Sequence, residues 1–307
     1  MTDELLPCGA HDCRLAAGPR EMDAGMLFIR CPTCAVLRIP PAKLIHQSVL
    51  PDPPRPLSLI MRLLMSMRML WLRGMVPALR DQSIQIVDAG CGDGQFLEFL
   101  QRLGYCHVIG IEPEPERLRH ARARKVPVVP SKAAAETRLG GPLAADIVIV
   151  WHVLEHVPQP LDFLRNYGAC LKSGGMIIVS VPNQQSIQTR LFGYFSAFPD
   201  YGRHLWYHDR SYVEWLRTQL PFHVAVLRDF NFEYEIFSWV DSIASAAMRR
   251  QNAVHKALKK GEGSSAWHLA MVAVSLLLLP AAAVLSCLSL ASGRGSTLTF
   301  VVRRSGG

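Results

Sequence analysis

Two acidic side chains and a glycine-rich segment give the clearest indication of a ligand-binding site in this sequence. Asp88 opens the segment 88–94 (Asp-Ala-Gly-Cys-Gly-Asp-Gly), and Glu112 follows further along the chain. Glycines at the end of a strand let a ligand approach the backbone closely, which is typical of nucleotide-binding crevices. The charge of Asp88 would repel a pyrophosphate but attract an ammonium or sulfonium group. Glu112 can accept hydrogen bonds from both hydroxyls of a ribose.

Three histidines further along the chain could take a proton from a reacting hydroxyl. His152 and His156 lie on either side of Glu155, and His204 lies in the aromatic segment 202–208. An imidazole titrates near neutral pH and can therefore act as a general base. For His156 and His204 the alternative is a structural role, in which the ring is bonded or packed within its own loop.

Four of the eight cysteines lie in the first 34 residues with the spacing of a metal site. Four residues separate the first pair, two separate the second, and seventeen lie between the pairs. This is close to the two knuckles of a zinc ribbon, where four thiolates hold a structural zinc ion. The expected ligands are Cys8, Cys13, Cys31 and Cys34. His11 could replace Cys13, and four unliganded thiols in a reducing cytosol are the alternative.

These residues must be positioned by a parallel sheet wrapped by helices, because short apolar segments alternate with amphipathic ones from residue 84 onward. We predict strands at Ile84–Ala89, Cys106–Glu112, Val126–Val129, Asp146–Trp151 and Met176–Val181, with helices at 94–103, 114–124, 133–138 and 159–171. A helix at 210–220, a strand at 222–230, a helical region at 232–260 and a last strand at 296–303 follow.

The motifs together resemble the class I S-adenosylmethionine-dependent methyltransferases of the small-molecule type. Segment 88–94 is similar to their glycine-rich first motif, 110–113 (Gly-Ile-Glu-Pro) to their ribose-binding acid, and 146–157 to their fourth strand and its loop. In the turn before the fifth strand, Ser173 stands where proline is usual. Over residues 84–183 the resemblance implies an α/β fold with a seven-stranded, doubly wound, Rossmann-like sheet whose last strand is antiparallel.

The resemblance also implies the cofactor, S-adenosylmethionine, and the residues that bind it. These are Asp88, Gly90, Cys91, Gly92, Gly94, Glu112, Pro113, Ala133 and Trp151. Ala133 is included only because the adenine position should follow the third strand, and Cys91 is expected to be a small buried side chain rather than a reactive thiol. His156, His204 and His152 are the candidates for the catalytic base.

A second unusual feature is the uncharged segment 266–291, which would measure about 39 Å as one helix and could span a bilayer. Because Pro280 interrupts it and the last strand must return to the sheet, we expect a bent, re-entrant pair of half-helices that anchors the chain to a membrane surface. Basic residues on both sides would meet anionic headgroups. A buried helical hairpin or a dimer interface is the alternative.

Composition divides the chain into five parts. They are a zinc-ribbon-like module (1–50), a proline-rich linker with a covering helix (51–80), the methyltransferase core (81–235), a helical, membrane-associating insertion (236–295), and the last strand and tail (296–307). Hydrophobic residues make up 50% of the 307 residues and charged ones 19%, which argues against disorder. The acidic N-terminus has no apolar core behind it, so we expect a cytoplasmic protein at the inner face of the membrane.

The resulting hypothesis is methyl transfer to a lipidic or lipid-linked small molecule, such as a quinone precursor or a glycan intermediate, at oxygen. With 33 Lys and Arg against 25 Asp and Glu, the net charge of +8 would also suit nucleic acid. An RNA methyltransferase that uses the zinc module to bind RNA is therefore the alternative. A zinc-ribbon binding module whose methyltransferase fold has lost its activity is a third hypothesis.

Overall fold

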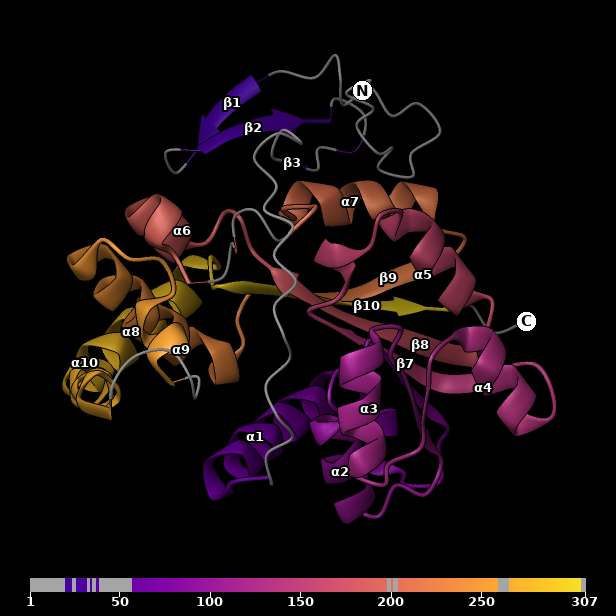
Figure 1. Cartoon of the computed structure of the whole chain (residues 1–307). Helices are drawn as coiled ribbons and strands as arrows, with labels where there is room; N and C mark the ends of the chain where they lie inside the picture. Colours follow the sequence, from indigo (N-terminus) through magenta and orange to yellow (C-terminus); the bar gives the residue numbers. More distant parts are fainter. Residues whose placement is uncertain are drawn as a thin grey trace, which may run out of the picture.

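The computed structural model describes residues 20–23, 26–31, 34, 37–38, 57–197, 200, 204–258 and 265–304. In this part of the chain a seven-stranded sheet carries helices on both faces, and three short strands near the N-terminus form a second sheet (Figure 1).

The large sheet has the strand order β6-β5-β4-β7-β8-β10-β9. Its strands are β4 (Ile86–Ala89), β5 (Val108–Ile111), β6 (Val128–Val129), β7 (Ala145–Trp151), β8 (Leu171–Pro182), β9 (His223–Arg228) and β10 (Thr297–Arg303). Neighbours from β6 to β8 pair in parallel, whereas β10 is antiparallel to both β8 and β9. The predicted doubly wound fold with an antiparallel last strand is thus confirmed. The strand order reverses between β4 and β7, and such a point is where ligands of α/β proteins bind.

Alternate side chains of the central strands point into two separate cores, as the two-residue period of a strand requires. For example, Ile147 and Ile149 of β7 pack in one core, and Val148 and Val150 pack in the other. The first core lies under α1 (Leu59–Met75), α2 (Gln95–Arg102) and α3 (Pro115–Ala123). The second lies under α4 (Lys132–Leu139), α5 (Pro160–Gly168) and α7 (Arg210–Gln219).

The small sheet consists of β1 (Arg20–Asp23), β2 (Met26–Arg30) and β3 (Leu37–Arg38), paired antiparallel. It lies beside α7 in Figure 1, and Arg30 Nη1 donates to Asp209 Oδ2 at 3.2 Å, just before that helix. Cys31 and Cys34 are fully buried within the same core as the α7 side chains. The other two expected zinc ligands, Cys8 and Cys13, and the alternative ligand His11 lie outside the described residues.

Three helices between β9 and β10 form a small body of their own, at the left of Figure 1. They are α8 (Phe232–Met248), α9 (Ala253–Leu258) and α10 (Ser265–Ser292), and their shared core also packs against α6 (Ile187–Phe192). Glu235 of α8, which is fully buried, accepts hydrogen bonds from the N–H and the hydroxyl of Ser296, both at 2.8 Å. This contact ties α8 to the start of the last strand.

The expectation of a re-entrant pair of half-helices is wrong, because α10 is one continuous helix with Pro280 inside it. Pro280 lies on the exposed side, where its ring removes one backbone hydrogen bond without meeting a packed neighbour. The other side of the helix packs along α8, and this packing keeps the helix continuous on both sides of the proline. The chain therefore reaches β10, the last strand of the sheet, through one helix that packs against the protein.

Candidate cofactor and acceptor site

The turn between β4 and α2 is tightly packed against the protein at Gly90 and open at Gly92. Gly90 has a φ of +81°, and a Cβ on it would lie 2.4 Å from Cγ2 of Val153, so no larger residue fits. Its N–H donates to the carbonyl of Ile111 at 2.7 Å and fixes the turn to β5. A Cβ on Gly92, whose φ is +59°, would have none of the described atoms within 4 Å. The backbone of the turn is thus accessible to a ligand.

Asp88 and Glu112 stand at the ends of the neighbouring strands β4 and β5, and both are almost fully buried. Burial raises the pKa of Asp88 to about 7; the charge of Arg68 lowers it, and the nearby carboxylate of Glu112 adds to the rise. Glu112 Oε2 accepts the N–H of Gly92 at 2.8 Å, which aligns this carboxylate with the turn. Two buried carboxylates whose charges interact favour a ligand that brings a positive charge.

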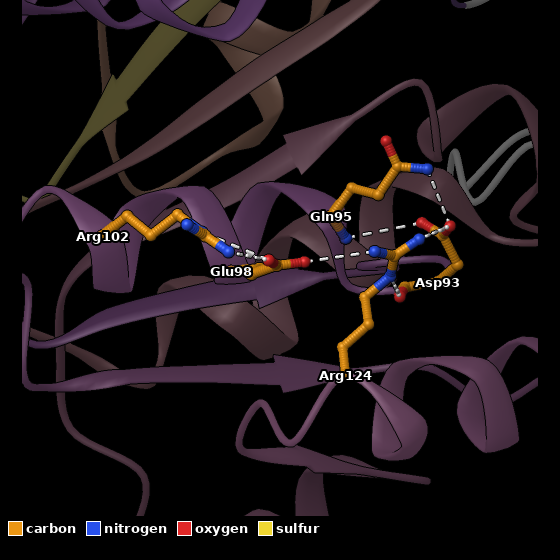
Figure 2. Close-up of polar contacts among 5 residues, drawn as sticks. All are labelled: Asp93, Gln95, Glu98, Arg102 and Arg124. Atoms are coloured by element: carbon orange, nitrogen blue, oxygen red, sulfur yellow. Dashed lines mark hydrogen bonds and ion pairs between the residues drawn. The ribbon is translucent and has the colours of Figure 1, made fainter. Parts of the chain in front are cut away.

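The turn is braced from below by Arg124, the residue that follows α3, as Figure 2 shows. Its Nε donates to the Asp93 carbonyl at 2.8 Å, and its Nη2 donates to Asp93 Oδ2 at the same distance. Its Nη1 reaches Glu98 of α2 at 3.1 Å, and the side chain is 6% exposed. Arg102 extends the network from its exposed end, where it pairs with Glu98. The position of the turn therefore depends on α2 and α3 together.

A buried ion pair joins α1 to α8 beside the two carboxylates. The Arg68 guanidinium of α1 donates through Nε to Glu233 Oε2 at 2.6 Å and through Nη2 to Oε1 at 2.5 Å. It also lies 4.7 Å from the ring centroid of Trp151 and 5.0 Å from that of Phe96. Because both partners of the pair are buried, its charges are screened little by water.

Aromatic side chains from three elements line the region beside the carboxyl end of β7. Trp151 ends β7, and its Nε1 donates to the hydroxyl of Tyr234 of α8 at 3.1 Å. Trp71 of α1 meets Trp151 edge to face with ring centroids 6.4 Å apart. Burial is the main reason that the pKa of Tyr234 rises to about 12, so its hydroxyl stays protonated near neutral pH. Such a wall suits an apolar, ring-containing ligand.

His152 follows Trp151 in a left-handed backbone conformation, with a φ of +54°. Its Nδ1 lies 3.2 Å from Oε1 of Glu155, and its ring lies 4.7 Å from that of Tyr234. Burial alone would raise the pKa of Glu155, but the hydrogen bond with His152 and the charges of the neighbouring histidines lower it to about 2. When the ionised carboxylate holds a proton on Nδ1, Nε2 becomes the nitrogen that can take a second proton. A non-glycine residue in this conformation is typical of functional sites.

The other two predicted bases, His156 and His204, lie together on another side of Glu155. Their ring centroids are 4.7 Å apart, and His156 is exposed whereas His204 is buried. The N–H groups of Leu205 and Trp206 donate to the carbonyl of Glu155 at 2.9 and 3.2 Å, which holds the His204 segment against the turn at Leu154–His156. Of the three histidines, His152 is the one in ring contact with Trp151 and Tyr234.

The remaining predicted cofactor residues differ in their surroundings. Burial raises the pKa of Cys91, and a Cβ built on Gly110 would lie 2.5 Å from its sulfur, so the thiol fills space beside β5. Pro113 is exposed just after β5, and Ala133 is exposed in the first turn of α4. The structure brings together Asp88, Glu112, the glycine turn and Trp151.

Sequence reasoning missed the residues that α1 and α8 contribute. Arg68 is one of three arginines in a helix rich in methionine and leucine, and Glu233 and Tyr234 lie at the start of a long helix. The sequence does contain a signal for Arg68. An amphipathic helix has its charged residues on the exposed face, whereas this arginine lies next to Met69, on the face that packs in the core.

The sheet, the glycine turn and the acid at the end of β5 define the fold of the class I S-adenosylmethionine-dependent methyltransferases. Residues 64–224, more than half of the chain, match the family model described as a methyltransferase domain. The chain belongs to this methyltransferase family. A solved structure of an S-adenosylmethionine-dependent methyltransferase from Archaeoglobus fulgidus superimposes with a TM-score of 0.47 and 16% identity, over 78% of this chain and 94% of its own.

Curated relatives match over part of this region. A ubiquinone biosynthesis O-methyltransferase of Colwellia psychrerythraea is 35% identical over 119 residues, which are 37% of this chain and 48% of the relative. One of Methylocella silvestris is 33% identical over 107 residues, 34% of this chain and 41% of the relative. The match thus spans about half the length of these relatives.

Proposed function

We propose that this protein transfers the methyl group of S-adenosylmethionine to an oxygen of a lipidic or lipid-linked small molecule, such as a quinone precursor. The observation that carries the proposal is the pair of buried carboxylates, Asp88 and Glu112, next to an aromatic wall and an imidazole that is oriented by a carboxylate. The printed name of the matched relatives, ubiquinone biosynthesis O-methyltransferase, supports the same class of acceptor. It gives no support to the RNA methyltransferase alternative.

Asp88 and Glu112 would hold the two ends of the cofactor. The ribose hydroxyls would donate to Glu112, whose Oε2 is already directed toward the turn by the N–H of Gly92. The positively charged methionine portion would lie near Asp88 and would favour its ionised form. The proposed contacts also include Gly90, Cys91, Gly94, Pro113, Ala133 and Trp151. When bound, the cofactor supplies a methyl carbon activated by its sulfonium.

His152 is the proposed proton acceptor. The hydroxyl of the acceptor gives its proton to Nε2, its oxygen forms a bond to the methyl carbon, and the carbon–sulfur bond breaks with its electron pair moving to sulfur. Glu155 keeps Nδ1 protonated and orients the ring, and the wall of Trp71, Trp151 and Tyr234 would hold an apolar ring in line with the methyl group. His156 and His204 are the other candidates for the proton acceptor, and His152 is preferred because its ring contacts Trp151 and Tyr234.

A membrane surface is the proposed source of the acceptor. By length and composition α10 is apolar enough to cross a membrane, and 17% of its most apolar stretch is buried. Its polarity is inverted: Ser289 faces inward and accepts the Trp239 Nε1–H at 3.1 Å, whereas Leu277 is 79% exposed. Further exposed apolar side chains on α10 are Leu269, Leu276, Val284, Leu288 and Leu290. A helix with a row of exposed leucines and with Ser286 and Ser289 buried suits lipid better than water.

Basic side chains near both ends of α10 support an anionic membrane surface. Arg249 and Arg250 precede the helix and Arg294 follows it, and all three are exposed. A second apolar stripe runs along α1, where Leu59, Leu63 and Leu70 are exposed. Since α1 and α10 both pack on α8, which brings Tyr234 to the aromatic wall, an acceptor could pass from the lipid to the site along this helix. We propose a location at the cytoplasmic face of a membrane.

The proposal also includes a structural zinc ion, held by Cys8, Cys13, Cys31 and Cys34. It further includes the division of the chain into five parts, with boundaries at residues 50, 80, 235 and 295. Cys31 and Cys34 are buried next to α7, where a zinc-bound module could pack on the domain. Such a module would make the N-terminal segment stable despite its small core.

The experiment that tests the function is metabolite profiling with isotopically labelled methionine. A strain that lacks this protein should accumulate a hydroxylated lipid-soluble compound, and the wild-type strain should contain its labelled methyl ether. Purified protein should then convert the accumulated compound in the presence of S-adenosylmethionine. A labelled nucleoside that disappears from the RNA of the deletion strain, with no change in lipids, would overturn the proposal.

A further inference from the structure

We propose that Arg30, on the small N-terminal sheet, is a positioning residue for the acceptor side of the proposed active site. Arg30 ends β2, and its Nη1 donates to Oδ2 of Asp209, just before α7, at 3.2 Å. The inference rests on the proposed function and deepens it, because it gives the N-terminal sheet a part in binding the methyl acceptor.

The first observation is that the carboxylate of Asp209 is buried and paired. Its side chain is 1% exposed, and in the part of the chain that the structure describes Arg30 is the cation that pairs with it. The side-chain amide of Gln185 also donates to Oδ2 of Asp209, at 3.1 Å. A buried carboxylate that loses its counter-charge destabilises its surroundings. The position of Asp209 therefore depends on the N-terminal sheet.

The second observation is that Asp209 joins elements at the carboxyl edge of the large sheet. Its Oδ1 accepts the N–H of Tyr212 at 3.2 Å and caps the first turn of α7. Gln185, which donates to the other oxygen, follows the end of β8. The end of β8 lies beside the end of β7, because Ser180 pairs with Trp151 of the aromatic wall. The contact from the N-terminal sheet thus reaches the same edge of the sheet as the proposed acceptor site.

The third observation is a buried imidazole next to Asp209 that has capacity for a ligand. His208 forms a β-bridge with Asn183, and its carbonyl accepts the N–H of Gln184 at 2.9 Å, so its backbone is fixed at the end of β8. His208 is 1% exposed, and neither ring nitrogen has a hydrogen-bond partner among the residues that the structure describes. Buried polar atoms without partners cost free energy, so this ring suits a polar atom of a ligand.

The chemistry of His208 indicates the group of the acceptor that it would bind. Burial lowers the pKa of His208 to about 4, so the ring is neutral near pH 7 and offers one N–H donor and one acceptor nitrogen. An uncharged hydroxyl group of the acceptor can bond to either nitrogen. Through Asp209, Arg30 holds His208 where it can meet that hydroxyl.

The test replaces Arg30 in the full-length chain. Arg30→Met removes the charge but should leave the sheet attached, because the neighbouring Cys31 is fully buried in the core with Tyr212. We expect this variant to raise the KM for a prenylated dihydroxybenzene, used as the probe acceptor, by about tenfold. The affinity for S-adenosylmethionine, measured by calorimetry, should stay unchanged. Arg30→Lys should recover part of the loss, since lysine restores the cation without the planar fork.

A second variant, His208→Leu, tests whether the two residues act together. It should raise the same KM by about tenfold, and the double variant with Arg30→Met should be little worse than either single variant. The matched control is Arg210→Met at the start of the same helix, since Arg210 is 54% exposed and pairs with Asp229 at 2.6 Å. Its KM should equal that of the wild type. An unchanged KM in Arg30→Met, or effects of Arg30→Met and His208→Leu that simply add, would overturn the proposal.

Hydrogen exchange separates this inference from the proposed function. Arg30→Met should speed amide exchange in residues 204–212 by about tenfold and leave exchange in residues 88–94 unchanged. If the wild-type chain binds S-adenosylmethionine but methylates no probe acceptor, the proposed function fails, and the exchange rates still decide whether Arg30 holds Asp209. Equal exchange in residues 204–212 of the variant and the wild type would show that it does not.

Discussion

At the scale of single residues, the chemistry depends on where charge is buried. Asp88 and Glu112 are buried acids at adjacent strand ends, and Glu155 is a buried acid that orients an imidazole. The surroundings shift two of them in opposite directions: desolvation dominates at Asp88 and raises its pKa, whereas hydrogen bonding and nearby imidazoles prevail at Glu155 and lower its pKa. At neutral pH Asp88 is therefore close to its pKa, and a bound cation would favour its ionised form. Glu155 is fully ionised, as it must be to hold a proton on Nδ1 of His152.

Replacing His152 by alanine should lower kcat by about 10²-fold or more, because the acceptor proton then has no positioned base. The affinity for S-adenosylmethionine should stay within about twofold, since His152 is not one of the proposed cofactor contacts. Single-turnover methyl transfer and calorimetry measure the two quantities, with His223→Ala, which changes an exposed histidine on β9, as the control. An unchanged rate in His152→Ala would remove this residue from the reaction.

For the secondary-structure elements, two helices on one face of the sheet, α2 and α3, position the glycine turn. Arg124 joins α2 and α3 to it, so loss of this side chain should leave the fold intact but loosen the turn (Figure 2). We expect Arg124→Ala to weaken S-adenosylmethionine binding by about tenfold, since hydrogen bonds to charged groups contribute about 1.5–3 kcal/mol. Arg102→Ala removes only the exposed end of the same network and should bind normally. If calorimetry gave Arg124→Ala and Arg102→Ala equal affinities for S-adenosylmethionine, Arg124 would not be needed to position the turn.

The ion pair between α1 and α8 should be sensitive to the loss of one partner. Arg68→Met leaves Glu233 buried without its counter-charge, which should cost about 3–5 kcal/mol of unfolding free energy. The double variant Arg68→Met with Glu233→Leu should recover most of this loss, because neither charge is then buried. Denaturant unfolding provides the measurement, and the exposed Arg119 offers a control whose replacement should change little. A double variant no more stable than the single one would show that the two residues are not coupled in this way.

Local patterns predicted the central elements well for a physical reason. Buried parallel strands such as β4 and β7 are short apolar runs with turn residues at their ends, so their sequence reveals them. Contacts between distant segments left no such signal. The pairing of Arg68 with Glu233 and the approach of His204 to Glu155 depend on how α1, α8 and the segment before α7 pack. The continuity of α10 through Pro280 likewise depends on its neighbour α8.

At the scale of the whole molecule, the methyltransferase core carries a helical body whose outer surface is apolar. Replacing Leu276 and Leu277 of α10 by serine should release the protein from anionic vesicles, because each buried leucine contributes about 1.5–3 kcal/mol to partitioning. Vesicle sedimentation should show a loss of about 100-fold or more in binding. Leu139 and Leu191, exposed on α4 and α6, are the matched control pair. Equal release by both pairs would mean that α10 has no special role.

Calorimetric titration compares the binding of S-adenosylmethionine with that of S-adenosylhomocysteine, whose sulfur is uncharged, and so tests whether Asp88 binds the positive charge of the cofactor. Because the pKa of Asp88 is raised to about 7, its carboxylate is present above that pH and is lost as the pH falls. The affinity for S-adenosylmethionine should therefore fall by up to about tenfold per pH unit below about 7, and that for S-adenosylhomocysteine should fall less. In Asp88→Asn the difference between the ligands should vanish, with S-adenosylmethionine bound at least about tenfold more weakly at pH 8. Undiminished binding of S-adenosylmethionine by Asp88→Asn would show that Asp88 does not hold the positive charge, and no binding by the wild-type chain would rule out the cofactor site.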